Sequence, residues 1–336
     1  MKINNRRYTG SKYKLIEWIK DLITANCADF RSFFDVFGGT GIITATMLND
    51  VQKAVINDFL YSNEICYKAF FGNEEYSPQN LKIFVDNVSA LDKKKLPDNY
   101  VSANYGDKYF NHDDAKLIGV IRERIQVIYE GGQLNEREFN ILLASLLYSF
   151  DRCANTVGHY DAYIKKVCLS NFEFELIEPI TGNSVVEIYR EDANKLARRI
   201  SADVAFVDPP YNSRQYSRFY HVMETIAKWD KPPLSGKAMK PPLENMSEYC
   251  RVNAPIVFND LIKNLNVRYI VVTYNNTYDS KSSSSRNKIT LNQIKEILNY
   301  RGNTKIFEKS YSRFNAGKTE TTDHKEYLFI TEVEDR

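Results

Sequence analysis

Short apolar runs recur along the chain, and several of them end at an acid, a glycine or an asparagine. Their length and their content of Val, Ile, Phe and Tyr are typical of buried β-strands. The first of them, SFFDVF, stops at a glycine-rich turn. These patterns predict strands at 32–37, 53–58, 185–189, 204–208, 269–274, 304–311 and 326–333.

Apolar residues at helical spacing fill several of the stretches between these runs. The order of strand, glycine turn, helix and strand near the start is the opening of a doubly wound α/β sheet. We therefore expect an α/β domain at 1–72 and 184–336, interrupted by a mostly helical insertion at 73–183. Helices are predicted at 11–26, 42–48, about 61–71, 113–130, 136–150 and 288–300.

Composition is that of a soluble globular protein, with 43% hydrophobic and 26% charged residues. The net charge of +2 does not by itself indicate a nucleic-acid partner. Basic residues nevertheless gather in 1–20, against the single acid Glu17, and again in 281–325. Such segments can follow a phosphate backbone, although a solvated basic face has the same pattern.

The five cysteines are scattered without a CxxC pair, and the four histidines are equally dispersed. This distribution argues against a disulfide framework and against a Cys/His zinc site, so we expect no metal and a reducing compartment. The N-terminus has no apolar signal region, and no apolar run approaches the roughly 18 residues of a membrane span. We expect a cytoplasmic protein without a membrane partner.

The turn Phe37-Gly-Gly-Thr-Gly41 joins the first strand to a helix. Glycines at such a turn let backbone N–H groups approach a ligand without obstruction by a Cβ atom. Asp58 ends the next strand, where an acid can bind ribose hydroxyls. The glycine turn and Asp58 would also suit a nicotinamide cofactor. A further alternative is that the turn is an ordinary tight turn without a ligand.

A second turn, Asp208-Pro-Pro-Tyr211, ends the strand at 204–208. Two prolines stop the strand abruptly and stiffen the backbone. The carbonyl of Pro209 can then lie beside the Asp208 carboxylate, and two neighbouring acceptors suit the two hydrogens of an exocyclic amine. Tyr211 supplies a flat ring on which a planar base can stack. The sequence thus predicts a clamp for a base amine.

The two turns together, with RRYTGSKYKLIEWI at 6–19, ANTVGHYDAYIK at 154–165, VVTYNN at 271–276 and EYLFI at 326–330, carry a family resemblance. The chain resembles the Dam-like, D12-class DNA adenine-N6 methyltransferases, and within them it is most similar to the FokI-type modification methylases. The resemblance implies a Rossmann-like methyltransferase fold with a mixed seven-stranded sheet. It also implies S-adenosylmethionine as cofactor and a target-recognition region within 73–183.

The resemblance assigns roles to individual residues. It implies that the tetrapeptide is catalytic, through Asp208, Pro209, Pro210 and Tyr211. It places the methionine end of the cofactor on the N-terminal motif, the ribose on Asp58 and the adenine near Asp192, although Glu191 is adjacent. The implied cofactor-binding residues are Tyr8, Gly10, Lys12, Asp35, Phe37, Gly39, Gly41, Asp58, Asp192 and Asp208.

Adenine N6 is unreachable inside a duplex, so such an enzyme extrudes its target base from the stack. We expect DNA contacts in the basic, aromatic segment after the tetrapeptide, for which a solvated loop is the alternative. We also expect them in the polar loop at 154–166, for which a loop that only packs on the catalytic domain is the alternative. Asn275 and Asn276 are candidates for lining the base pocket. The expected DNA-binding residues are Asn155, His159, Tyr160, Lys165, Arg214, Tyr216 and Arg218.

The resulting hypothesis is a site-specific DNA methyltransferase of a restriction-modification or DNA-methylation system, prokaryotic or phage-encoded. Its partners would be double-stranded DNA with a short recognition sequence and a cognate restriction endonuclease. An RNA base amino-methyltransferase is the alternative, because Asp-Pro-Pro-Tyr also occurs in some enzymes that modify guanine N2. A binding protein that has kept the fold and lost catalysis is a third reading, which the intact tetrapeptide disfavours.

Overall fold

The computed structural model describes residues 1–164, 171–276, 286–310 and 325–334. Contacts divide the chain into two compact units, and each unit is assembled from three separate stretches of sequence. We call them the helical unit and the sheet unit. The helical unit consists of Met1–Ser11, Leu60–Thr181 and Ser217–Glu244, and the sheet unit of Lys12–Phe59, Gly182–Tyr216 and Asn245–Arg336.

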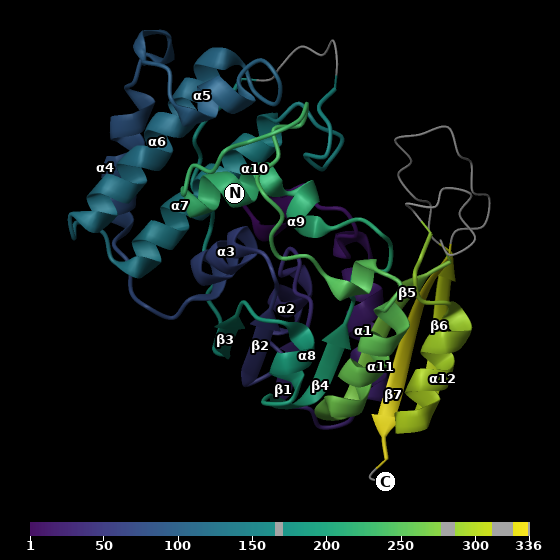
Figure 1. Cartoon of the computed structure of the whole chain (residues 1–336). Coiled ribbons are helices and arrows are strands. Elements are labelled where there is room, and N and C mark those ends of the chain that lie inside the picture. The colour runs from purple at the N-terminus through teal and green to yellow at the C-terminus, as the bar shows by residue number, and fades with distance from the viewer. Residues whose placement is uncertain (165–170, 277–285, 311–324, 335–336) are drawn as a thin grey trace. The chain divides into compact units, whose positions relative to one another are not determined.

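Among the described residues of the sheet unit, seven strands form one mixed sheet in the order β3-β2-β1-β4-β5-β7-β6 (Figure 1). The strands from β3 to β5 are parallel, whereas β7 runs antiparallel to both of its neighbours. This arrangement confirms the expected mixed seven-stranded α/β sheet. The strands are β1 (Ser32–Asp35), β2 (Lys53–Asn57), β3 (Val185–Tyr189), β4 (Ser201–Val207), β5 (Asn266–Asn275), β6 (Gly302–Ser310) and β7 (Lys325–Val333).

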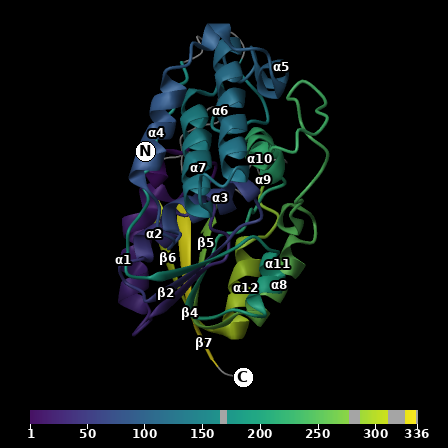
Figure 2. The same ribbon diagram turned by 90° about the vertical axis from the view of Figure 1, so that its left-hand side faces the viewer.

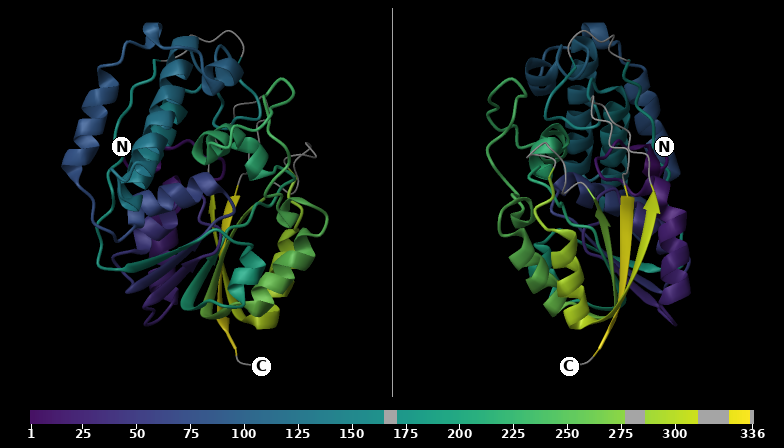
Figure 3. Two further views of the ribbon diagram at one scale, coloured as in Figure 1. Left: turned by 60° about the vertical axis from the view of Figure 1, so that its left-hand side comes forward. Right: turned by 90° about the vertical axis from the view of Figure 1, so that its right-hand side faces the viewer.

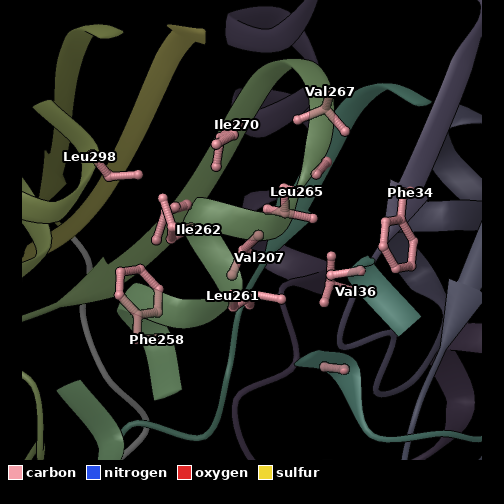
Figure 4. Close-up of a cluster of buried hydrophobic side chains, with 14 of the residues drawn as sticks. Phe34, Val36, Val207, Phe258, Leu261, Ile262, Leu265, Val267, Ile270 and Leu298 are labelled. Atoms are coloured by element: carbon pink, nitrogen blue, oxygen red, sulfur yellow. The ribbon is translucent and has the colours of Figure 1, made fainter. Parts of the chain in front are cut away.

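Helices cover both faces of this sheet, as expected for a doubly wound fold (Figure 3). One face packs against α8, α11 and α12, and α1 lies on the other. Figure 4 shows part of the core of the first face, in which Phe34 and Val207 of the sheet belong to the same buried cluster as Phe258 and Leu261 of α11. The helices are α1 (Ile16–Asn26), α2 (Ile42–Met47), α8 (Ala193–Ala197), α11 (Ala254–Asn264) and α12 (Leu291–Arg301), with 3-10 turns at Tyr13–Leu15 and Glu248–Cys250.

The helical unit is built around α7, which is buried over most of its length between α3 and α6 (Figure 2). None of the helices in the part of the chain that the structure describes is long and apolar enough to cross a membrane. The helices are α3 (Tyr61–Phe71), α4 (Pro78–Ser89), α5 (Tyr100–Tyr105), α6 (His112–Glu130), α7 (Glu136–Cys153), α9 (Tyr216–Phe219, of which Tyr216 belongs to the sheet unit) and α10 (His221–Lys228), with 3-10 turns at Ile3–Asn5 and Lys93–Lys95.

Two buried side chains hold α10 within this unit. Glu224 accepts hydrogen bonds from the backbone N–H groups of Tyr61 (3.1 Å) and Ser62 (2.8 Å) in the first turn of α3. At the other end of α10, Arg122 donates to the carbonyl oxygens of Ile226 (2.8 Å) and Ala227 (3.0 Å). The segment after the tetrapeptide is therefore an integral part of the helical unit from Ser217 onward.

Candidate active site

Four of the predicted site segments follow four neighbouring parallel strands. The glycine turn follows β1, Asp58 follows β2, Asp192 lies shortly after β3, and Asp208 follows β4. The carboxyl ends of parallel strands meet at one edge of a sheet, so the fold brings these segments together. The chain leaves β1 toward β2 and leaves β4 toward β5, which makes the β1–β4 pair the topological switch point of the sheet, where doubly wound folds bind ligands.

The glycine turn and Asp58 are directly joined. Gly39 and Gly41 have φ angles of 54° and 77°, which L side chains rarely adopt. The turn closes through a hydrogen bond from Gly41 N to the Gly38 carbonyl oxygen at 2.7 Å, and α2 begins immediately afterwards. Gly39 N donates to Asp58 Oδ2 at 2.9 Å. The two halves of the predicted cofactor site are therefore one hydrogen-bonded structure.

Asn57 holds the ends of three strands together and was not predicted as a site residue. It is buried, and its Nδ2 donates to the carbonyl oxygens of Val36 (3.2 Å) and Glu191 (3.1 Å). Its Oδ1 accepts from Glu191 N at 2.9 Å. The only signal in the sequence was an amide at the end of an apolar strand, one position before Asp58.

Asp192 occupies the start of α8. Its Oδ1 accepts from Lys195 N at 3.0 Å, so that it is the N-cap of the helix. Glu191, which competed with it as a candidate, forms an ion pair with Arg199. Phe37 packs edge-on against Tyr249 with a ring-centroid distance of 5.1 Å. These contacts keep the strand ends around the predicted adenine position in a fixed arrangement.

Asp35 lies inside the protein beneath this edge. Its side chain is 1% exposed, and Thr44 Oγ1 donates to its Oδ2 at 2.9 Å. Burial raises the pKa of Asp35 to about 7, and the nearby carboxylates of Asp208 and Asp58 contribute in the same direction. Three carboxyl groups thus lie close enough to interact electrostatically at one end of the sheet unit.

Both carboxylate oxygens of Asp208 are engaged. Thr273 Oγ1, on β5, donates to Oδ1 at 2.6 Å. Lys12 Nζ lies 2.8 Å from Oδ2, and both side chains of this ion pair are largely shielded from solvent. Lys12 was expected near the methionine end of the cofactor, and Thr273 was not predicted at all. Its signal was a single hydroxyl within an apolar strand.

Tyr211 is held more firmly than a surface tyrosine would be. Its ring is 6% exposed and packs edge-on against Tyr274, with ring centroids 5.0 Å apart. Its hydroxyl donates to the Thr273 carbonyl oxygen at 2.5 Å, and its own carbonyl oxygen accepts from Lys288 N at 2.6 Å. Thr273 therefore fixes both ends of the tetrapeptide. Of the two candidates for lining the base pocket, Asn275 accepts a hydrogen bond from Asn287 Nδ2 at its carbonyl oxygen, and Asn276 Oδ1 accepts one from Lys325 N.

The residues at this edge suit a cofactor that carries positive charge and hydroxyl groups. The carboxyl groups of Asp58 and Asp208 lie close to Asp35 and add to the rise in its pKa, which burial chiefly causes. Backbone at Gly39 and Gly41 has no Cβ atom to hinder a close approach. These acidic side chains and this unobstructed backbone therefore fit S-adenosylmethionine, which has a sulfonium, an ammonium and a ribose.

The other predicted cofactor residues, Tyr8 and Gly10, belong to the helical unit. Gly10 has a φ of 83°, so the motif turns at a glycine here as well. The ring of Tyr8 lies parallel to that of Tyr220, with centroids 4.7 Å apart. The boundary between the two units falls after Ser11, inside the motif itself.

The loop after α7 is tightly constructed. Asn155 Nδ2 donates to the carbonyl oxygens of Lys108 (3.1 Å) and Ile164 (2.7 Å). The His159 ring stacks on Phe219 with centroids 4.3 Å apart. Tyr160 is fully buried, and its hydroxyl donates to Asp151 at 2.8 Å. The expectation that Tyr160 contacts DNA therefore gives way to a structural role. Lys165 lies outside the described residues.

The two arginines that follow the tetrapeptide lie in different local structures, Arg214 in a turn and Arg218 in a helix. Arg214 N donates to Asn212 Oδ1 at 3.0 Å, within a turn that leaves the arginine partly exposed. Arg218 is in α9, and its Nη1 donates to the Pro241 carbonyl oxygen at 2.7 Å. Tyr216 is partly exposed at the first position of the same helix.

The basic residues of 1–20 mostly have protein partners. Arg6 is buried, and Arg7 donates to the carbonyl oxygens of Ala154 (2.9 Å) and Thr156 (3.2 Å). Lys12 pairs with Asp208, and Lys20 Nζ lies 2.8 Å from an oxygen of Asp50. These contacts argue against 1–20 as a surface that follows phosphates.

Comparison with known proteins identifies the class of this sheet and site. Residues 8–285 match the family model of D12 class N6 adenine-specific DNA methyltransferases. The chain therefore belongs to this family, and it is a DNA adenine-N6 methyltransferase by class, as the two turns and their order predicted.

Individual relatives resemble the chain over almost all of its length. It is 29% identical to the type II methyltransferase M.NlaIII of Neisseria lactamica over 97% of this chain and 98% of that protein. It is 30% identical to M.CviAII of Paramecium bursaria Chlorella virus 1, covering 99% and 100%. It is also 30% identical to M.FokI of Planomicrobium okeanokoites, covering 96% of this chain and 52% of that protein, which bears out the likeness to the FokI-type enzymes.

Proposed function

We propose that the protein transfers a methyl group from S-adenosylmethionine to N6 of an adenine extruded from duplex DNA at a specific short sequence. The observation that carries this proposal is Asp208, whose carboxylate at the end of β4 lies between Lys12 and Thr273. The glycine turn and Asp58 follow the adjacent strands of the same sheet. Membership of the D12 family supports adenine and DNA as the target.

The cofactor would be held by residues that follow the parallel strands and by the N-terminal motif. Asp58 suits the ribose hydroxyls, and the backbone of the glycine turn suits a close approach. When bound, this cofactor supplies a methyl group whose bonding electrons remain on the sulfur. The proposed cofactor residues are Tyr8, Gly10, Lys12, Asp35, Phe37, Gly39, Gly41, Asp58, Asp192 and Asp208.

Asp208 and the Pro209 carbonyl would accept hydrogen bonds from the two N6 hydrogens. These bonds draw the nitrogen lone pair out of conjugation with the ring and orient it for attack, which is catalysis by position and electrostatics. Once N6 carries the methyl group it is cationic, and its surplus proton passes to the Asp208 carboxylate. Tyr211, fixed through its hydroxyl, would support the base by stacking.

Extrusion of the base costs a few kcal/mol, which contacts to DNA must supply. We assign these contacts to Asn155, His159, Arg214, Tyr216 and Arg218, and the reading of the sequence to the helical insertion at 73–183. The enzyme would act in the cytoplasm on double-stranded DNA, within a restriction-modification system that includes a cognate endonuclease. The type II methyltransferases among its relatives support this setting.

The test is methyl transfer from labelled cofactor to unmethylated duplex DNA, with ribosomal RNA as a second substrate and the modified nucleoside identified by mass spectrometry. We expect N6-methyladenine in DNA and no label in RNA. Label in N2-methylguanine of RNA would replace this proposal with the RNA alternative.

Asp208→Ala should lower methylation by at least about two orders of magnitude, as loss of a group that bonds the transition state does. The same variant should keep cofactor binding in calorimetry, because the glycine turn and its bond to Asp58 are unchanged, with a modest weakening from the loss of one nearby acid. Asp260→Ala, which removes a partly exposed partner of Arg198 in the sheet unit, serves as the matched control. Substantial activity in Asp208→Ala would exclude the catalytic role.

A further inference from the structure

A stack of two aromatic rings, one of them fully buried, holds the N-terminal motif in the helical unit. Tyr8 and Tyr220 lie face to face, with ring centroids 4.7 Å apart and planes inclined by only 6°. Tyr220 is fully buried at the N-cap position of α10. The two residues are far apart in sequence, so the stack joins the start of the chain to the segment that follows the tetrapeptide.

The guanidinium of Arg6 lies against both rings, with Cζ 5.2 Å from the centroid of Tyr8 and 5.6 Å from that of Tyr220. Arg6 is buried, and its Nη1 donates to Asn63 Oδ1 at 2.6 Å. Its Nε and Nη2 have no hydrogen-bond acceptor among the described residues. A cation within about 6 Å of an aromatic face is attracted to it. The cation of Arg6 therefore stabilises the stack by contacting both rings, while two of its nitrogens form no hydrogen bond to the described residues.

Tyr220 also bonds the backbone of the motif. Its hydroxyl oxygen accepts a hydrogen bond from Thr9 N at 2.7 Å. The next residue, Gly10, turns the chain with a φ of 83°. Tyr220 thus contacts Tyr8 through its ring and Thr9 through its hydroxyl, immediately before the turn. Burial raises the pKa of Tyr220 to about 12, so the hydroxyl stays neutral throughout the physiological range.

We propose that Tyr220 is a positioning residue for the cofactor: it holds Tyr8, Thr9 and Gly10 in the conformation that receives the methionine end. This inference rests on the proposed function, which assigns that end of the cofactor to the motif. Tyr220 lies between Arg218 of α9 and the first residue of α10. Within the helical unit, Tyr220 therefore connects the end of α9, where Arg218 is proposed to contact DNA, to Tyr8 and Gly10 of the N-terminal motif.

Two variants separate the contributions of the ring and the hydroxyl. Tyr220→Phe keeps the stack and removes the hydroxyl's bonds to Thr9 N and to the Gly158 carbonyl oxygen (3.4 Å), whereas Tyr220→Leu removes the stack as well. The matched control is Tyr148→Phe, because Tyr148 is also buried in the helical unit and its hydroxyl donates to the backbone of the N-terminal segment, at Ile3 O (3.0 Å). The control removes an equivalent bond outside the motif.

Cofactor dissociation constants by calorimetry, steady-state kinetics and thermal unfolding would be measured on the full chain. Tyr220→Phe should weaken cofactor binding about two- to twelvefold, the usual net value of one hydrogen bond expressed as affinity, and Tyr220→Leu more strongly. The KM for cofactor should rise in parallel while kcat at saturating cofactor stays within about twofold. Tyr148→Phe should lower thermal stability similarly and leave cofactor affinity unchanged.

Unchanged cofactor affinity in Tyr220→Phe, with wild-type protein that binds cofactor and methylates DNA, would overturn the positioning role and leave the proposed function intact. Equal losses of affinity in Tyr220→Phe and Tyr148→Phe would overturn it as well, since they would show general loosening of the N-terminal segment. If the wild-type chain bound no S-adenosylmethionine, the proposed function and this inference would fail together.

Discussion

Asp35 shows how burial, with a smaller contribution from nearby acids, sets the charge of a single residue. It is buried beside the glycine turn, and its pKa of about 7 lies far above the ordinary value of 3.8. A carboxyl group whose pKa is raised on folding binds its proton more tightly in the folded chain. The free energy of unfolding must therefore fall as pH rises from about 4 to about 7, and the full loss is present above pH 7.

Asp35→Asn should remove this pH dependence. The variant should be more stable than the wild type at pH 8, by at most about 4 kcal/mol, because it carries no charge to desolvate. The difference should shrink toward pH 4, where the wild-type carboxyl is protonated in the folded chain. Urea unfolding at a series of pH values measures it. A difference that is constant across the series would show that Asp35 is not protonated on folding.

At the level of single residues, the sequence indicated candidates where chemistry and local pattern coincide. The acids at strand ends, Asp58 and Asp208, and the glycines of the turn were recognisable because their neighbours in sequence reveal the strand. Thr273 and Tyr220 were not, because each acts on a partner far along the chain, at Asp208 and Thr9 respectively. A hydroxyl inside an apolar segment carries no sign of which distant group it will meet.

Among the elements, the turn between β1 and α2 requires left-handed backbone at two glycines, Gly39 and Gly41. Gly41 is the N-cap of α2 with a φ of 77°. Gly41→Ala should destabilise the protein by about 1–2 kcal/mol, the cost of a Cβ atom in left-handed backbone. It should also weaken cofactor binding, because the turn and Asp58 form one hydrogen-bonded structure.

Gly182→Ala provides the comparison for this substitution. Gly182 also belongs to the sheet unit, and a Cβ atom there would meet only an ordinary contact at 3.9 Å with Leu48. Thermal unfolding and calorimetry of the two variants separate the effects. Equal behaviour of the two would show that the left-handed turn is not what the cofactor site requires.

Elements with a continuous apolar run were predictable, and β3 and α3 lie where the patterns placed them. The predicted helix at 11–26 begins only at Ile16, after a 3-10 turn, and the predicted strand at 32–37 ends at Asp35, where the backbone leaves the sheet for the glycine turn. The helices α4, α5, α8, α9, α10 and α11 were not predicted. In α11 the signal was present, because Pro255 stands in the first turn, where proline favours a helix start.

At the scale of the whole molecule, the helical unit depends on contacts between its separate stretches. Arg122 of the expected insertion bonds the end of α10, and Tyr100 donates its hydroxyl to the Pro232 carbonyl oxygen at 2.7 Å. Deletion of 73–183 would remove both and expose the buried face of α10, which includes Val222, Met223 and Ile226.

We therefore expect that the deletion variant does not retain an intact catalytic domain. It should lose cooperative unfolding, and its molecules should associate with one another. Circular dichroism during heating and light scattering at constant concentration would measure the two effects, with the full chain as reference. A monomeric deletion variant with a sharp transition would show that the remaining segments fold without the insertion.

The interleaving of the two units also constrains how such an enzyme can change its recognition sequence in evolution. Each unit is assembled from three stretches, so the chain passes from one unit to the other at Ser11, Phe59, Thr181, Tyr216 and Glu244. A single recombination event exchanges one contiguous piece of a gene. It would import part of a helical unit and leave its Arg122, Glu224 or Tyr220 facing foreign partners. New specificities in this architecture should therefore arise by substitution within the stretches more readily than by exchange of whole cassettes between relatives.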